Sequence, residues 1–399
     1  MSRAKVGIVG AGTMGAGIAQ VALEGGWDVV LHDPQPGATA RARSRIADGL
    51  ARRAAKLGAD ADGIDDWVGG RLAGLSVVPS VAAIAAESQL VVEAALEDLE
   101  LKRGIFRELD AAADAGTILA SNTSALSIAK IAEATRRPER VVGLHFFNPA
   151  PVLPLVEVVA TAATEDDVVS RAIGFVEGWG KTPIRCADSP GFIVNRVNRP
   201  FTLEPLRLVH AGVATIETVD AAITEAGFPM GPFRLMDLIG IDVNLAAARG
   251  LWEGFGRAPR FRPSPIQEEL VAAGRLGRKT GEGFYRYGDG GAVLGTAARF
   301  AGPLRPRPGV EPIEPEAISE RVILAIVNEA YRALGDRVAT AGDIDLAMRL
   351  GANHPFGPFA WAGETGLQEV ALGLDGLSDE DADTFRPALE LLRAARRAG

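Results

Sequence analysis

The sequence predicts an α/β domain with a doubly wound parallel sheet, followed by two tandem all-α domains. Three observations lead to this prediction. A short apolar run near the N-terminus is followed directly by a glycine-rich loop and a helical stretch. Apolar runs and helical stretches then alternate as far as about residue 187. In the C-terminal half, one pattern of helical residues and Gly-Pro breaks occurs twice.

The composition excludes several classes of protein. The 399 residues exceed the size that one hydrophobic core usually supports, so two or three domains are expected. A net charge of −9 argues against nucleic acid or an anionic membrane as a partner. The single cysteine, Cys186, excludes an intramolecular disulfide and a multi-cysteine metal site, and no other residues show metal-ligand spacing. The sequence shows neither a signal peptide nor a long apolar span, which predicts a cytoplasmic protein.

The N-terminal segment has the order strand, glycine loop, helix, strand. Residues 5–9 are apolar, and Gly10, Gly12 and Gly15 follow with the spacing G-x-G-x-x-G, while the second apolar run ends at Asp33. These glycines permit a tight turn and a close approach of a pyrophosphate to the free N–H groups of the helix. The Asp33 carboxylate can accept hydrogen bonds from a ribose and would repel a 2′-phosphate. The segment therefore predicts a Rossmann-type domain that binds NAD rather than NADP.

Further strands are predicted at residues 75–78, 90–93 and 117–120, with a helix at about 99–113. Before the third strand, a long helical insert carries a group of cations. They could bind a polyphosphate ligand, or they could form an ordinary solvated helix face. The group consists of Arg41, Arg43, Arg45, Arg52, Arg53 and Lys56.

Two apolar runs on either side of a proline-rich turn each contain one ionisable residue. His145 and Glu157 lie equally far from Pro151 in the sequence. If the two runs pair around this turn, the two side chains can meet. An imidazole that is held by a buried carboxylate is suited to act as a general base. The alternative is a satisfied core histidine and an independent buried acid.

Two further polar residues are candidates for substrate contacts. Ser124 follows the strand that ends near residue 120, at the edge where such sheets bind ligands, although it could also be the N-cap of the next helix. A helix is predicted to start at Ser189-Pro190, and Asn195 interrupts its apolar face. By itself, Asn195 would be interpreted as an interhelix hydrogen-bonding residue.

The C-terminal half contains an internal repeat. Residues 203–207 resemble residues 328–332, and residues 229–233 resemble residues 355–359. Two copies of one helical domain are therefore expected. Asn195 aligns with Glu320, so we expect the second copy to be structural. The predicted division is a dinucleotide-binding domain at 1–187, a first helical copy at 188–288, a Gly/Pro-rich linker at 289–315 and a second, degenerate copy at 316–399.

These motifs together resemble the L-3-hydroxyacyl-CoA dehydrogenases, including those for 3-hydroxybutyryl-CoA and 3-hydroxyadipyl-CoA. The resemblance runs in order over about residues 4–287. It implies reversible NAD-dependent oxidation of an L-3-hydroxyacyl-CoA to the 3-ketoacyl-CoA, and both short and dicarboxylyl acyl chains suit it. The motifs lie at residues 10–15 with 33, 92–94, 97–102, 121–124, 145–149, 155–157, 190–196, 231–233 with 237, and 279–285.

The resemblance also implies roles for single residues. His145 would be the catalytic base and Glu157 the acid that orients it, while Ser124 and Asn195 would hold the substrate oxygens. The cationic insert would help to bind CoA, through Arg52, Arg53 and Lys56. The expected NAD contacts are Gly10, Gly12, Thr13, Met14, Gly15, Asp33, Glu97, Lys102 and Asn148.

Two other functions stay open from the sequence: a non-catalytic NAD-binding protein that retains the fold, and a dehydrogenase of free hydroxy acids. In single-copy members of the family, helical domains of two subunits pair. We therefore expect the two copies here to form a pseudo-dimer within one chain, and further homo-oligomerisation is compatible with this arrangement.

Overall fold

The computed structural model describes residues 5–302 and 312–398. The chain divides into two compact units, Met1–Phe192 and Ile193–Gly399. Among the described residues, no helix combines the length and the apolar character that crossing a lipid bilayer requires.

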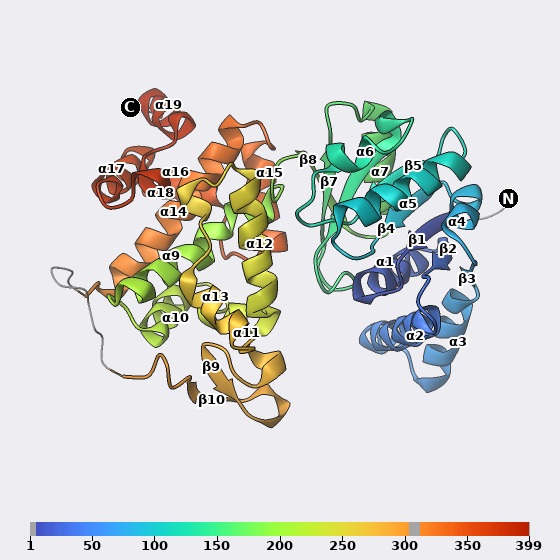
Figure 1. Cartoon of the computed structure of the whole chain (residues 1–399), viewed down its shortest axis with the longest axis horizontal. Coiled ribbons are helices and arrows are strands. Elements are labelled where there is room, and N and C mark those ends of the chain that lie inside the picture. The colour runs from blue at the N-terminus through green and yellow to red at the C-terminus, as the bar shows by residue number, and fades with distance from the viewer. Residues whose placement is uncertain (1–4, 303–311, 399) are drawn as a thin grey trace. The chain divides into compact units, whose positions relative to one another are not determined.

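The first unit contains one eight-stranded sheet (Figure 1). Its strand order is β3-β2-β1-β4-β5-β6-β7-β8, which reverses direction beside β1 as the doubly wound prediction requires. All neighbouring strands are parallel except β6 and β7, which are antiparallel. The strands are β1 Lys5–Val9, β2 Asp28–His32, β3 Leu75–Val77, β4 Leu90–Glu93, β5 Ile118–Ser121, β6 Val141–Phe146, β7 Leu155–Ala160 and β8 Thr182–Ala187.

Helices connect most of these strands and cover both faces of the sheet. The insert between β2 and β3 forms two of them, α2 and α3. The helix predicted near Ser124 begins at Ile128 instead, because the Ser127 hydroxyl accepts the Lys130 N–H and caps it. The helices are α1 Thr13–Glu24, α2 Ala38–Lys56, α3 Ala61–Leu72, α4 Val81–Glu87, α5 Leu99–Ala112, α6 Ile128–Ala132 and α7 Asp166–Gly178, with a 3₁₀ turn at Pro138–Arg140.

The second unit is mostly helical. Its first helix begins at Val194, after a turn, rather than at Ser189-Pro190 as predicted. The first helical segment contains α8 Val194–Val197, α9 Arg199–Ala211, α10 Ile216–Glu225, α11 Pro232–Ile239, α12 Ile241–Gly254 and α13 Pro265–Ala272, with 3₁₀ turns at Pro259–Phe261, Arg278–Thr280 and Asp289–Gly291. The second contains α14 Pro315–Gly335, α15 Ala341–Gly351, α16 Pro358–Thr365, α17 Leu367–Ser378, α18 Ala382–Phe385 and α19 Leu389–Ala398.

The two helical segments use the same local devices at equivalent positions. Asp220 accepts the N–H groups of Phe233 and Arg234 at the start of α11, and Asp345 accepts those of Phe359 and Ala360 at the start of α16. Such a carboxylate satisfies donors that a helix N-terminus leaves open. Gly240 and Gly366 then have φ angles of 109° and 100° between the next two helices of each segment.

Part of the predicted linker is instead packed onto the first helical segment. Strand β10 (Val293–Thr296) pairs with β9 (Tyr285–Tyr287), and the Phe300 ring lies 5.4 Å from that of Phe284. The Gly-rich composition therefore marks a tight hairpin up to about residue 297, where Ala297 is buried. Residues 303–311, in the middle of the predicted linker, lie outside the described residues.

Candidate active site

The glycine loop between β1 and α1 is shaped for close contact with a ligand. Gly10 has φ +101°, and a Cβ there would lie 2.6 Å from the Ala94 carbonyl oxygen. A Cβ at Gly15 would overlap the Gly10 carbonyl oxygen. In contrast, a Cβ at Gly12 would meet nothing within 4 Å, and both Gly12 and Thr13 are exposed. The N-terminus of α1 thus presents N–H groups to an open space, which fits the pyrophosphate of NAD.

Asp33 lies directly after β2 and holds this loop. Its Oδ2 accepts the Ala11 N–H at 2.7 Å, and its Oδ1 accepts the Gln35 N–H at 2.8 Å. Each carboxylate oxygen can accept a second hydrogen bond, so a ribose hydroxyl can still bind. The arrangement fits NAD, because a 2′-phosphate here would meet a fixed negative charge.

A buried ionic network occupies the carboxyl ends of β4 and β5. The Lys102 ammonium lies 2.7 Å from Glu93 Oε1 and 3.4 Å from Glu97 Oε2, and Ser121 Oγ donates to Glu93 Oε2 at 2.7 Å. Lys102 is 1% exposed, so its charge is used inside the protein rather than presented at the surface. Glu93 lies in the motif at residues 92–94 but was not among the predicted site residues, although an acid at the end of an apolar strand is a signal for such a role.

Glu97 connects this network to the loop after β5. Its Oε1 accepts hydrogen bonds from Thr123 Oγ1 at 2.5 Å and from the Ser124 N–H at 3.0 Å. Ser124 is exposed at this edge of the sheet. Asn148, also exposed, lies in the connection between β6 and β7. Met14, in the first turn of α1, is half-buried against the core of the first unit.

His145 and Glu157 face each other across β6 and β7. The strands pair in the register His145↔Glu157, and Nδ1 lies 2.6 Å from Glu157 Oε2. His145 is 5% exposed and Glu157 is fully buried. With Nδ1–H donated to the carboxylate, Nε2 carries a lone pair and can accept a proton.

Two aromatic rings shield this pair. The centroids of Phe147 and Phe192 lie 4.5 and 5.7 Å from the His145 ring. Apolar neighbours strengthen the interaction between the imidazole and the carboxylate, because they exclude water from it. Phe147 and Phe192 were not among the predicted site residues, since aromatic residues beside an apolar strand are typical of any core.

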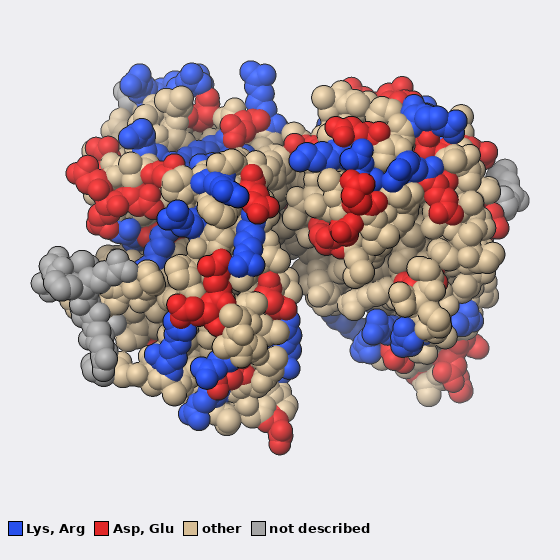
Figure 2. All heavy atoms as spheres, in the orientation of Figure 1, with Lys and Arg blue, Asp and Glu red and all other residues tan. Residues whose placement is uncertain are grey.

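The cations of α2 are exposed. Arg52, Arg53 and Lys56 lie near its C-terminal end, and Figure 2 shows blue side chains over this helix. Arg53 Nε is 4.0 Å from Glu24 Oε2. Arg41, Arg45, Arg52 and Lys56 are spaced by four or seven residues and so share one face of the helix.

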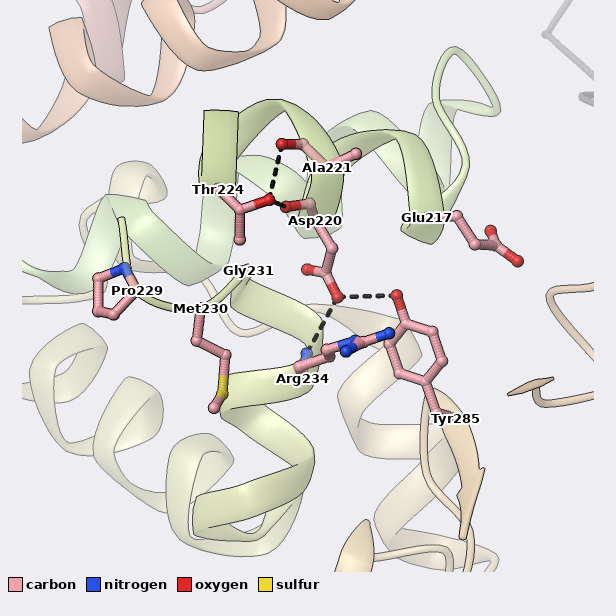
Figure 3. Close-up of a pocket in the computed structure, with 9 residues that line it drawn as sticks. All are labelled: Glu217, Asp220, Ala221, Thr224, Pro229, Met230, Gly231, Arg234 and Tyr285. Carbon is pink, nitrogen blue, oxygen red and sulfur yellow. Dashed lines mark hydrogen bonds between the residues drawn. The ribbon is translucent and has the colours of Figure 1, made fainter. Parts of the chain in front are cut away.

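Asn195 belongs to the second unit, where it lies half-buried on α8 beside the fully buried Arg196. A pocket elsewhere in this unit is lined by Asp220, Arg234 and Tyr285 (Figure 3). Its acid already accepts the Tyr285 hydroxyl at 2.7 Å as well as the N–H groups at the start of α11. Because Asp345 caps α16 in the same way, we interpret Asp220 as a structural residue.

Comparisons with known proteins agree with this geometry. The family model of the 3-hydroxyacyl-CoA dehydrogenase NAD-binding domain matches residues 5–189, and that of the C-terminal domain matches residues 191–287 and 318–399. The chain is 36% identical to 3-hydroxyadipyl-CoA dehydrogenase of Escherichia coli, over 97% of this chain and 96% of that one. It is 44% identical to the mitochondrial hydroxyacyl-coenzyme A dehydrogenase of Rattus norvegicus, over 71% of this chain and 90% of the relative.

A solved structure matches the whole chain as well. The crystal structure of 3-hydroxybutyryl-CoA dehydrogenase from Escherichia coli superposes with a TM-score of 0.87, at 36% identity, and covers 100% of this chain and 99% of the other. Both family models, the full-length relative and this structure indicate the same family. The chain belongs to the 3-hydroxyacyl-CoA dehydrogenase family.

Proposed function

We propose that this chain catalyses the reversible, NAD-dependent oxidation of an L-3-hydroxyacyl-CoA to the 3-ketoacyl-CoA, with His145 as the general base. The observation that carries the proposal is the 2.6 Å contact between His145 Nδ1 and the buried Glu157 carboxylate. The family supplies the reaction class, and the glycine loop with Asp33 fits the cofactor.

In this mechanism, Nε2 of His145 takes the proton of the 3-hydroxyl group as the carbonyl bond forms at C3. NAD⁺, when bound, supplies the acceptor for the hydride that leaves C3. Glu157 stabilises the imidazolium that results, because its charge lies against Nδ1–H in a water-poor environment. In the reverse direction, the imidazolium returns this proton to the oxygen.

We assign the substrate contacts as follows. Ser124 and Asn195 hold the 3-oxygen and the thioester carbonyl, and Asn148 contributes to the NAD site beside the glycine loop. The cations Arg52, Arg53 and Lys56 bind phosphates of CoA. The exposure of these three side chains supports this assignment, because a ligand in solvent can reach them.

We also propose that the two helical segments are copies of one domain that pair as a pseudo-dimer. Two reciprocal ion pairs support this. Arg196 Nε lies 2.7 Å from Glu329 Oε1, and Arg321 Nε lies 2.5 Å from Glu204 Oε1. Arg321 and Glu329 follow Arg196 and Glu204 by 125 residues, which is the offset of the sequence repeat. Each copy thus gives the same arginine to the same glutamate of the other, as in a two-fold interface.

The test follows NADH formation with 3-hydroxybutyryl-CoA for the wild type and for His145→Gln. We expect turnover by the wild type and a large loss in the variant. An absence of turnover, combined with normal NAD binding, would instead indicate a non-catalytic NAD-binding protein. If kcat/KM for the free hydroxy acid equalled kcat/KM for its CoA thioester, the chain would instead be a dehydrogenase of free hydroxy acids.

A further inference from the structure

Arg199, at the start of α9, is a buried cation without a counter-ion. It is 5% exposed, and no carboxylate of residues 5–302 or 312–398 forms an ion pair with it. Burial lowers the pKa of its guanidinium to about 10, so the group remains charged at neutral pH. A buried charge without a partner is strongly unfavourable. Such charges occur at functional sites, where a bound ligand can supply the opposite charge.

The surrounding amides hold only one side of this guanidinium. Asn244 Oδ1 lies 3.4 Å from Arg199 Nη1 and also accepts Gln267 Nε2 at 2.7 Å. Arg199 Nε is buried and has no hydrogen-bond partner among the described residues. Arginine binds carboxylates bidentately through two parallel N–H groups. Nε–H is therefore a donor that no described residue uses, on the side of the guanidinium that a carboxylate would pair with.

The second helical copy shows that the fold does not need this cluster. At the offset of the repeat, Arg199 corresponds to Leu324 and Asn244 to Val370, and both counterparts are buried. An aliphatic core is thus sufficient at these two positions in the copy that lacks the substrate asparagine. The polar residues occur only in the copy that carries Asn195, which associates them with the substrate rather than with packing.

The position of Arg199 relative to Asn195 suits an acyl chain of moderate length. Arg199 follows Asn195 by four residues, and the backbone from Ile193 to Asn198 is helical. Residues four apart in a helix lie on the same face, about 5–6 Å apart at Cβ. An extended chain of five carbon–carbon bonds of about 1.5 Å each covers a comparable distance.

We propose that Arg199, which contacts Asn244, binds a carboxylate at the far end of the acyl chain, so that the preferred substrate is a dicarboxylyl 3-hydroxyacyl-CoA. This proposal rests on the proposed function, because Asn195 must hold the thioester end of the same chain. A substrate with a neutral chain would leave the Arg199 charge without a partner. The ligand class agrees with the name of the full-length relative, a 3-hydroxyadipyl-CoA dehydrogenase.

The experiment compares kcat/KM of the full-length protein for 3-hydroxyadipyl-CoA and 3-hydroxyhexanoyl-CoA, which have six-carbon chains and differ in the terminal group. We expect the wild type to prefer the dicarboxylyl substrate by roughly 10²-fold or more, since a buried polar site rejects a ligand that cannot pair with it. Arg199→Leu, which copies residue 324, should lower this ratio by roughly the same factor. Arg199→Lys should retain an intermediate ratio, because a lysine cannot bind bidentately.

Arg249→Met is the matched control, because Arg249 pairs with Glu268 at the surface of the same segment, and it should leave the ratio unchanged. A second measurement needs no variant: adipyl-CoA should inhibit the wild type at least tenfold more strongly than hexanoyl-CoA does. A wild-type preference for the neutral substrate, or an unchanged ratio in Arg199→Leu, overturns the proposal. Turnover of neither substrate, nor of 3-hydroxybutyryl-CoA, would instead overturn the proposed function.

Discussion

The Arg196 guanidinium of the first helical segment forms a buried ion pair with Glu329 of the second. Their side chains are 0% and 2% exposed, and the Nε–Oε1 distance is 2.7 Å. Glu329 also accepts Arg260 Nε at 3.0 Å, so one carboxylate serves two arginines. Its loss leaves a buried guanidinium without this partner, and we expect Glu329→Ala to lower the free energy of unfolding by about 3–5 kcal/mol.

Urea denaturation at neutral pH measures this change. Glu320→Ala is the control, because Glu320 is exposed on the same helix, and it should shift the free energy of unfolding by less than about 0.5 kcal/mol. If both variants were equally stable, the ion pair would not contribute to the packing of the two copies.

Cofactor choice depends on Asp33. Asp33→Ala should reduce the preference for NADH over NADPH, because the negative charge that repels a 2′-phosphate is removed. Ratios of kcat/KM for the two cofactors give the result directly. A wild-type enzyme that used NADPH as well as NADH would contradict the role assigned to this carboxylate.

The general base is tested by two substitutions. His145→Gln should lower kcat by roughly 10²–10⁴, the usual contribution of a positioned base. Glu157→Gln should lower kcat less, since the imidazole remains. NAD affinity, measured by calorimetry, should change little in either variant, because the glycine loop lies on other strands. Wild-type turnover by His145→Gln would eliminate the mechanism.

CoA placement is tested at the end of α2. Reversing the charge of Arg52 and Arg53 to Glu should raise KM for the acyl-CoA, and the effect should grow as salt is lowered, because exposed charges are screened by ions. Arg107→Glu on α5 controls for the change in net charge. If KM for the acyl-CoA did not depend on ionic strength, these arginines would instead belong to an ordinary solvated helix face.

Asp220 should make stability depend on pH. Burial raises its pKa to about 6 from an ordinary value of 3.8. The folded state therefore binds this proton more tightly than the unfolded state does. Relative to Asp220→Asn, the wild type should gain up to about 3 kcal/mol as pH falls from 6 to 4, and lose it as pH rises.

Unfolding free energies of both proteins across this range test the sign. Asp345→Asn is the comparison from the second copy, where a more exposed carboxylate has its pKa raised by the same cause. We expect a shallower dependence there. A difference between wild type and Asp220→Asn that stays constant with pH would contradict the assignment.

The sequence was sufficient where a local rule governs the structure. The spacing of Gly10, Gly12 and Gly15 predicted the loop, and at Gly10 and Gly15 only glycine tolerates the close approach of the neighbouring backbone. The symmetry of His145 and Glu157 about Pro151 predicted their register, because residues equally far from the midpoint of the connection face each other when the two strands pair antiparallel.

The remaining features depend on long-range packing. Lys102 was expected to contact NAD, and only the fold places its ammonium beside Glu93. Strand β10 of the hairpin with β9 was not predicted, because the glycine-rich composition around it indicated a linker. Arg199 could not be singled out from the sequence, where it is one arginine on a predicted helix. Only the fold shows that it is buried and that no carboxylate lies beside it.

The reciprocal pairs of Arg196 with Glu329 and Arg321 with Glu204 join two parts of one polypeptide. Dilution therefore cannot separate the halves, whereas two separate subunits dissociate as their concentration falls. A single gene for both halves also removes a constraint on evolution. In a homodimer each mutation appears on both sides of the axis, whereas in the proposed pseudo-dimer one segment carries Asn195 and the other carries Glu320 at the corresponding position. Under the proposed assignment, one segment can thus be specialised for chemistry and the other for support.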